Sequence, residues 1–124
     1  MNLTNEEIRI KIAESLGYER RPSEWPNYIT WYNPSGKYIP LIAHVGNLTD
    51  QAARVPNYPE SLDAMREAKL SLTNDQLGTM LDHLCEIVRR DHNKELGPMT
   101  AIIQAFRATA AQEAEAYLKT KGII

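Results

Sequence analysis

The sequence has few of the features that hold small secreted or membrane proteins together. It contains one cysteine, Cys85, among 124 residues, so no disulfide can form within the chain. No apolar run is long enough for a signal peptide or a membrane-spanning helix, and the N-terminus passes directly into charged residues. These absences predict a cytoplasmic protein with no membrane partner.

An excess of charge of either sign is also missing. The 14 Lys and Arg residues nearly balance the 16 Asp and Glu residues, which gives a net charge of −2 at pH 7. Because no general electropositive field results, we expect no duplex nucleic acid as a partner. The length and the 43% hydrophobic content suit one folded domain spanning residues 1–124.

Motifs for metal binding and for catalysis are absent as well. His44, His83, His92 and Cys85 form no pair at the spacing of a structural zinc site. The sequence has no glycine-rich phosphate loop, nucleophile elbow or His-Glu-x-x-His motif. It therefore predicts neither a metal nor a cofactor, and it favours a protein that is not an enzyme.

The strongest positive signal is helical periodicity in the C-terminal half. The capping box of Thr73 and Gln76 starts an amphipathic helix over residues 74–91. Pro98 suits a first helical turn and starts a second helix, predicted over residues 99–120. The short break between them favours an antiparallel helical pair.

Shorter elements precede this pair. Helices are expected over residues 5–16 and 60–70. The aromatic and β-branched segment 28–32 and the segment 37–39 flank the turn signal Asn33–Gly36, which predicts a β-hairpin. The irregular stretch between His44 and Ser61 is expected to be a loop or a fragment of edge strand.

The predicted fold class is therefore α+β: a small antiparallel β-sheet covered by helices, with a C-terminal antiparallel helical pair. Ile87 and Ile102 widen the apolar surface of that pair. Because the two helices offer more apolar surface than so small a sheet covers, we expect a homo-oligomer, at least a dimer.

Two carboxylates, Asp91 and Glu113, fall near the apolar stripes of their predicted helices. A buried carboxylate needs a partner, since burying it unpaired costs several kcal/mol, roughly. Either each one reaches solvent or a salt bridge at the edge of its stripe, or the two face a pocket or a subunit interface.

Arginines accompany Trp, Tyr and Asn in this sequence, and this combination is typical of nucleotide binding. Guanidinium groups bind phosphates, aromatic rings stack on bases and amides bind base edges. The alternative is that the arginines are scattered and solvated. The candidate ligand-binding residues are Arg107, Arg54, Asn93, His92, Arg90, Arg21 and Trp31.

Three segments together resemble phage ABA sandwich domain proteins: IAESLGY at 12–18, VPNYPESLDAM at 55–65 and ATAAQEAEAYL at 108–118. The last segment is the most specific of the three. Glu113 stands where the family pattern has a basic residue. The resemblance covers most of the chain and implies a small phage protein, located in the cytoplasm of the infected bacterial host.

The chain is also similar, more distantly, to the Thoeris anti-defence 1 proteins of phages, through its size and its sheet followed by two long helices. That resemblance implies a sponge, which binds a cyclic ADP-ribose-type signal or a cyclic oligonucleotide without cleaving it. Two alternatives stay open: a phage protein that binds a host or virion protein through its helical face, and an enzyme that cleaves cyclic nucleotides with Glu113, His83 or His92 as acid or base.

Overall fold

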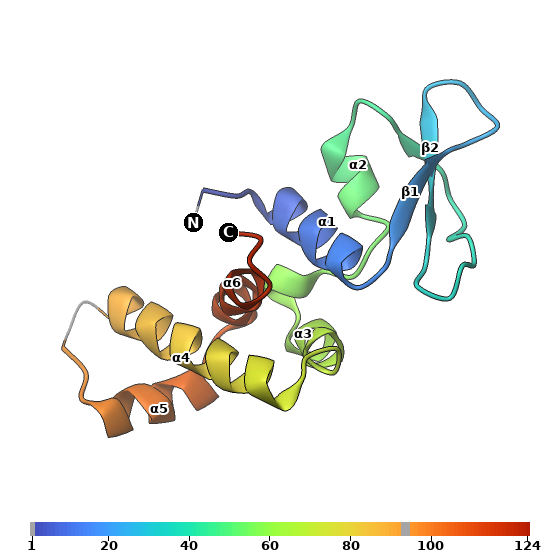
Figure 1. Ribbon diagram of the computed structural model, residues 1–124. Helices are drawn as coiled ribbons and strands as arrows, with labels where there is room; N and C mark the ends of the chain where they lie inside the picture. The colour runs from blue at the N-terminus through green and yellow to red at the C-terminus, as the bar shows by residue number, and fades with distance from the viewer. Residues whose placement is uncertain (1, 93–94) are drawn as a thin grey trace. The chain divides into compact units, whose positions relative to one another are not determined.

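The computed structural model describes residues 2–92 and 95–124 (Figure 1). The chain forms two compact units, one up to Asn57 and one from Tyr58 onwards. The fold class is α+β, as predicted, with a three-stranded antiparallel sheet and helices that hold several times as many residues as the strands. The single domain over 1–124 stays a prediction.

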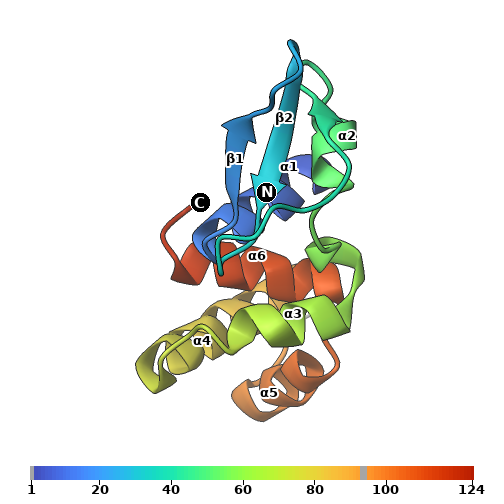
Figure 2. The ribbon, with the colours of Figure 1, turned by 90° about the vertical axis from the view of Figure 1, so that its right-hand side faces the viewer.

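The first unit holds two helices and the sheet. Its elements are α1 (Asn5–Ser15), β1 (Glu19–Pro22), β2 (Tyr28–Tyr32), β3 (Ala43–His44) and α2 (Leu48–Ala52). The capping box predicted for the first helix is present, since Thr4 and Glu7 bond reciprocally to each other's backbone N–H groups. The strands lie in the order β1-β2-β3, with β2 in the centre (Figure 2).

One face of the sheet packs against the helices of this unit. Arg20 and Trp31 are directly opposite each other in the register, so their side chains share that face. The Arg20 guanidinium contacts Glu14 of α1 at 3.2 Å, and the Trp31 indole N–H donates to the backbone carbonyl of Gln51 of α2 at 2.9 Å. The core of the first unit therefore lies between this face and the two helices.

The predicted turn at Asn33–Gly36 is present, but the hairpin is only partly formed. The Gly36 N–H donates to the Asn33 carbonyl at 2.9 Å, and Gly36 has a φ of +87°. The returning segment makes only an isolated bridge between Tyr38 and Tyr32. Pro40 has no N–H to extend this pairing, so the chain leaves the sheet.

Two elements of the first unit, β1 and α2, were not predicted from the sequence. The polar sequence of β1 does not predict a strand. This segment is extended because it pairs with β2. β3 is the edge-strand fragment that was one of the two expectations for this region. Helix α2 begins at a recognisable N-cap, because the Asn47 side chain accepts from the Asp50 N–H at 3.0 Å.

The second unit is helical. Its elements are η1 (Tyr58–Glu60), α3 (Leu62–Lys69), α4 (Asn74–Asp91), α5 (Pro98–Phe106) and α6 (Ala110–Thr120). α6 is buried at every residue from 113 to 118 and packs against α3, α4 and η1. It is the central helix of this unit. None of the helices in the described ranges is long and apolar enough to cross a membrane.

The helix predicted over 99–120 is in fact two helices, and this part of the prediction was wrong. α5 ends at Phe106, and Thr109 takes an extended backbone conformation with a ψ of 161°. Thr109 and Gln112 form a capping box that starts α6. The signal was present in the sequence, but the continuous apolar pattern concealed it. α5 returns alongside α4, as expected for the helical pair (Figure 1).

Substitution of the cap tests this break. Thr109→Ala removes the side-chain acceptor of the Gln112 N–H, so we expect a loss of about 1 kcal/mol in the free energy of unfolding. Thr100→Ala, at an exposed position in the first turn of α5, is the matched control and should change stability by less than about 0.5 kcal/mol. Urea unfolding followed by circular dichroism measures both. Equal stability of the two variants would contradict the capping role.

Candidate functional site

The second face of the sheet is open and carries aromatic side chains. Arg21 is opposite Thr30 in the register and Tyr28 is opposite His44, so these four residues share the face away from the core. Tyr32 lies on the same face, two residues beyond Thr30. The rings of Tyr28 and His44 meet edge to face, with centroids 5.4 Å apart. The strands thus place aromatic and polar groups together on an uncovered surface.

Beside Tyr32 this surface contains a hollow of about 310 Å³. Its lining residues are Pro22, Ser23, Glu24, Trp25, Thr30, Tyr32, Tyr38, Ile39 and Ile42. Trp25 is 66% exposed and Tyr38 is 67% exposed, although both are large aromatic residues. The Ser23 hydroxyl accepts from the Trp25 N–H at 3.1 Å and donates to the Trp25 carbonyl at 2.8 Å, which fixes the loop that presents this ring.

Arg21 supplies a cation next to the aromatic residues. Its guanidinium carbon lies 4.2 Å from the centroid of the Tyr32 ring, a cation–π distance. It also pairs with Glu19 at 3.0 Å. The hydrogen bond between them raises the pKa of Arg21 and lowers the pKa of Glu19. Both side chains are about half exposed, so this pair contributes little to stability and an anionic ligand can compete for the guanidinium.

The other candidate residues of the first unit have structural roles. Trp31 is 1% exposed, its N–H is bonded to Gln51 and the Arg20 guanidinium covers its ring at 5.4 Å. It has no free face for a ligand, so its assignment as a stacking residue is corrected. Arg54 forms a salt bridge at 2.9 Å with Asp50, which lies four residues earlier in the chain.

Four candidates belong to the second unit by sequence, and the structure describes three of them. Arg90 donates two hydrogen bonds to the Glu115 carboxylate, at 2.6 and 3.0 Å, so its guanidinium already has a partner within the chain. The His92 Nδ1 lies 2.8 Å from the Val88 carbonyl at the end of α4. Arg107 is exposed at the end of α5, and within the described ranges it has no hydrogen-bond or ion-pair partner. Asn93 lies outside the described residues.

The candidate residues of the first unit therefore do not form one cluster. In the first unit, Arg21 and Trp31 point to opposite faces of the sheet, as the alternation along β1 and β2 requires. The residues that surround the hollow, Trp25, Tyr32 and Tyr38, were not among those predicted. The alternation of Tyr28, Thr30 and Tyr32 against Ile29 and Trp31 is the sequence signal that identifies the open face.

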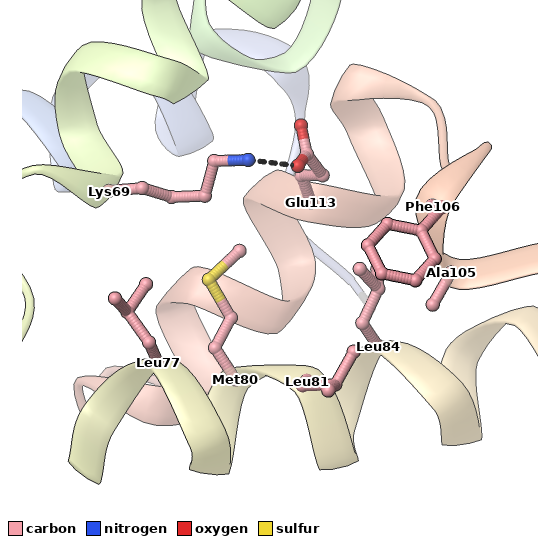
Figure 3. A pocket seen from close by; sticks show the side chains of 8 residues that line it. All are labelled: Lys69, Leu77, Met80, Leu81, Leu84, Ala105, Phe106 and Glu113. Atoms are coloured by element: carbon pink, nitrogen blue, oxygen red, sulfur yellow. Dashed lines mark hydrogen bonds and ion pairs between the residues drawn. The ribbon is translucent and has the colours of Figure 1, made fainter. Parts of the chain in front are cut away.

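The second unit has a pocket of its own, of about 340 Å³ (Figure 3). It is lined by Lys69, Leu77, Met80, Leu81, Leu84, Ala105, Phe106 and Glu113. The ion pair between Lys69 and Glu113 closes one end, and Phe106 stands at the other. Glu113 thus has both features considered in the sequence analysis, a salt bridge and a position in a pocket.

Asp91 belongs to a separate polar network around Arg90. It accepts hydrogen bonds from Arg90 at 2.8 Å and from Gln112 at 3.0 Å, and these lower its pKa. Burial raises the pKa of Glu115, but the hydrogen bonds and charge of Arg90 and the charge of Lys119 outweigh burial, so the net shift is downward. The hydrogen bond with Glu115 in turn raises the pKa of Arg90. This network holds α4 against α6.

No cluster of three or more His, Cys, Asp or Glu side chains suited to a metal ion occurs in the part of the chain that the structure describes. Comparisons of the chain with models of known protein families, with curated proteins and with solved structures found no match.

Loss of Arg90 should destabilise the second unit in a pH-dependent way. Arg90→Ala leaves the buried Glu115 with only Lys119, 3.6 Å away, so we expect a loss of about 1–3 kcal/mol at pH 7. Arg89→Ala, at the exposed neighbouring position, is the control and should fall within about 0.5 kcal/mol of wild type.

The pH dependence has a definite sign. The pKa of Glu115 is lower in the folded state than in the unfolded state. Its contribution to the free energy of unfolding is therefore complete above the unfolded-state pKa of about 4.3, and it is lost as the pH falls through the folded-state pKa. The stability difference between wild type and Arg90→Ala should therefore shrink below about pH 4. Urea titrations at pH 7 and in steps below pH 5 measure it, and a difference independent of pH would contradict this account.

Proposed function

We propose that this chain is a non-enzymatic phage protein that binds and sequesters a small phosphorylated nucleotide signal, of the cyclic ADP-ribose or cyclic oligonucleotide type. The observation that carries this proposal is the open sheet face with its aromatic hollow and Arg21. Its biological setting, an anti-defence sponge in the infected host, comes from the resemblance of the sequence to phage proteins.

The hollow supports nucleotide binding through its mixture of side chains. An exposed aromatic ring on a sheet offers its π-face to a base without regard to the base's identity. Trp25 and Tyr38 are exposed at the hollow, and Tyr32 lines the same hollow with the guanidinium of Arg21 over its ring. Thr30 at the same hollow has a hydroxyl suited to the ribose or to a base edge. Exposed aromatic side chains that cluster in this way are typical of an interaction site.

The affinity that a sponge requires sets a further condition. Nanomolar binding corresponds to roughly −12 kcal/mol, whereas two stacked rings supply about 1–3 kcal/mol each. The remainder must come from charge-assisted hydrogen bonds to phosphate, the chemistry for which guanidinium groups are suited. Arg21 contacts the ring of Tyr32, which lines the hollow, and it is held by only an exposed ion pair, so it is the proposed phosphate ligand.

The experiment is a thermal-shift screen of the purified chain against cyclic ADP-ribose isomers and cyclic di- and trinucleotides. A ligand present at 100 times its Kd should stabilise the protein by about 2.7 kcal/mol. Heat denaturation of the complex should then release the ligand unchanged. Recovery of a cleaved product would contradict sequestration and would support the enzymatic alternative.

Variants at the hollow test its role once a nucleotide is found. Trp25→Ala removes one stacking ring and should weaken binding by roughly 5- to 150-fold. Arg21→Glu sets a carboxylate against the phosphate and should abolish detectable binding. Arg66→Glu, whose side chain is 76% exposed in the second unit, is the charge-reversal control and should bind as wild type does. Unchanged affinity in both hollow variants would place the ligand elsewhere.

The predicted phosphate contact of Arg107 is tested in the same assay. Its guanidinium is exposed and unpartnered within the described ranges, so Arg107→Glu leaves the core intact. If Arg107 contacts phosphate, this variant should lose binding under conditions where its oligomeric state equals that of wild type. Wild-type affinity would remove Arg107 from the set of ligand residues.

A further inference from the structure

One carboxylate lines the aromatic hollow of the first unit, and the nucleotide binding proposed for this hollow assigns it no role. Glu24 lies between Ser23 and Trp25 in the loop that joins β1 to β2, and it is exposed. Its side chain has no hydrogen-bond or ion-pair partner in the part of the chain that the structure describes. Glu19, by contrast, is paired with Arg21. The Glu24 carboxylate is therefore available to a ligand.

Hydrogen bonds hold the backbone around Glu24 in one conformation. Ser23 bonds to the backbone of Trp25 through its hydroxyl at 2.8 and 3.1 Å, which closes a turn around Glu24. The Ser23 N–H donates to the Tyr28 carbonyl at 3.1 Å, and the Tyr28 N–H donates to the Trp25 carbonyl at 3.3 Å. Pro26 follows with its φ angle fixed by the ring. A group presented by an ordered backbone loses less conformational entropy when a ligand binds.

The two charges near the hollow lie towards opposite ends of β2. Glu24 belongs to the loop that precedes Tyr28 at the start of the strand, whereas the Arg21 guanidinium lies over the ring of Tyr32 at its end. Four residues of strand separate these ends by about 13 Å. Because a phosphate is attracted to Arg21 and repelled by Glu24, a bound nucleotide should place its phosphate towards Tyr32 and its base towards Glu24.

The hydrogen-bonding groups of the bases differ in how they match a carboxylate. An ionised carboxylate accepts hydrogen bonds and donates none. The Watson–Crick edge of guanine presents two adjacent donors, the N1–H and the 2-amino group, which the two oxygens of one carboxylate can accept together. Adenine and cytosine each present one amino group beside a ring nitrogen whose lone pair faces the carboxylate, and uracil presents one N–H between two carbonyl oxygens. Guanine is therefore the common base that a carboxylate binds best.

We infer that Glu24 selects guanine: its carboxylate accepts the N1–H and the 2-amino group of a guanine base that lies against Trp25, while Arg21 binds the phosphate. The inference rests on the proposed nucleotide binding and deepens it, since it names the base. Of the two proposed ligand types, it favours a cyclic oligonucleotide that contains guanine over the cyclic ADP-ribose type, whose base is adenine.

An ammonium ligand is the other class of molecule that aromatic rings and a carboxylate attract. In this hollow, however, a cation already lies over Tyr32, because the Arg21 guanidinium carbon is 4.2 Å from the centroid of that ring. A second cation would be repelled by this charge while it is attracted by Glu24. The position of Arg21 therefore favours a ligand that carries both a negative group and hydrogen-bond donors, as a guanine nucleotide does.

Three cyclic dinucleotides that differ only at the Watson–Crick edge of the base test the inference: cyclic diguanylate, cyclic diinosinate and cyclic diadenylate. Isothermal titration of the full chain should give a Kd for the diguanylate at least tenfold below that for the diadenylate, because a site that hydrogen-bonds a group discriminates against an analogue without it. The diinosinate keeps the N1–H and lacks the 2-amino group, so its Kd should lie between the other two.

Glu24→Gln changes the base preference without changing the shape of the side chain. The Gln amide offers one acceptor and one donor group, which match the 6-amino group and the N1 of adenine. The variant should bind the diguanylate at least tenfold more weakly than wild type does, and the diadenylate at least as tightly. A purely structural role of Glu24 would weaken both ligands alike. Glu67→Gln, at an exposed position of α3 in the second unit, is the matched control and should keep the wild-type preference.

The outcomes separate this inference from the proposed function. If wild type binds the diadenylate as tightly as the diguanylate, or if Glu24→Gln keeps the preference for the diguanylate, a nucleotide is bound but Glu24 does not select its base. Only the inference is then overturned. If none of the three dinucleotides binds, the inference is overturned as well. The proposed function is overturned with it only if no other nucleotide in the thermal-shift screen binds either.

Discussion

The second unit depends on the pairing of two carboxylates on its central helix. α6 is buried from residue 113 to residue 118, and this run includes Glu113 and Glu115. An unpaired carboxylate in such a place costs several kcal/mol, roughly, so each must meet a cation from another helix. Lys69 at the end of α3 meets Glu113, and Arg90 at the end of α4 meets Glu115. The two ion pairs therefore fix where α3 and α4 lie on α6, while the apolar contacts supply most of the stability.

A single polar residue has a comparable role in the first unit. Gln51 is 5% exposed, and all of its side-chain polar groups have partners. Its amide nitrogen donates to the carbonyls of His44 and Val45, and its amide oxygen accepts from Arg20. Its backbone carbonyl accepts from Trp31. Gln51 of α2 is thus hydrogen-bonded to residues of all three strands on one face of the sheet. The opposite face takes no part in these contacts.

The periodic parts of this fold could be predicted from the sequence. The capping boxes at Thr4 and Thr73 start helices where expected, and the Asn33–Gly36 turn forms. Prediction failed where tertiary contacts override local pattern. β1 has no strand propensity and is ordered by β2, and the apolar pattern across Thr109 suggested a continuous helix where a cap interrupts it.

The candidate site was less predictable, because the chemistry of a residue does not specify whether its side chain points to the core or to the surface. Trp31 and Tyr32 are adjacent, yet one is core and the other lies at an open hollow. Arg90 and Arg107 are both near helix ends, yet only Arg90 faces a buried carboxylate. Only the strand register and the helix phase separate these cases, and both are set by packing partners distant in sequence.

The exposed apolar groups of the two units differ in chemistry, and this difference bears on what covers them. Around the hollow of the first unit, aromatic rings alternate with Thr30, Glu24 and the guanidinium of Arg21. Such a mixture keeps water near the rings and suits a ligand that is itself part aromatic and part charged. On α5 the exposed side chains of Met99, Ile103 and Phe106 form a stripe without a charged residue, and Arg107 follows directly after it. An apolar stripe of this kind resembles the core of a protein interface more than it resembles a nucleotide site. The two surfaces therefore differ in the kind of partner that their side chains suit.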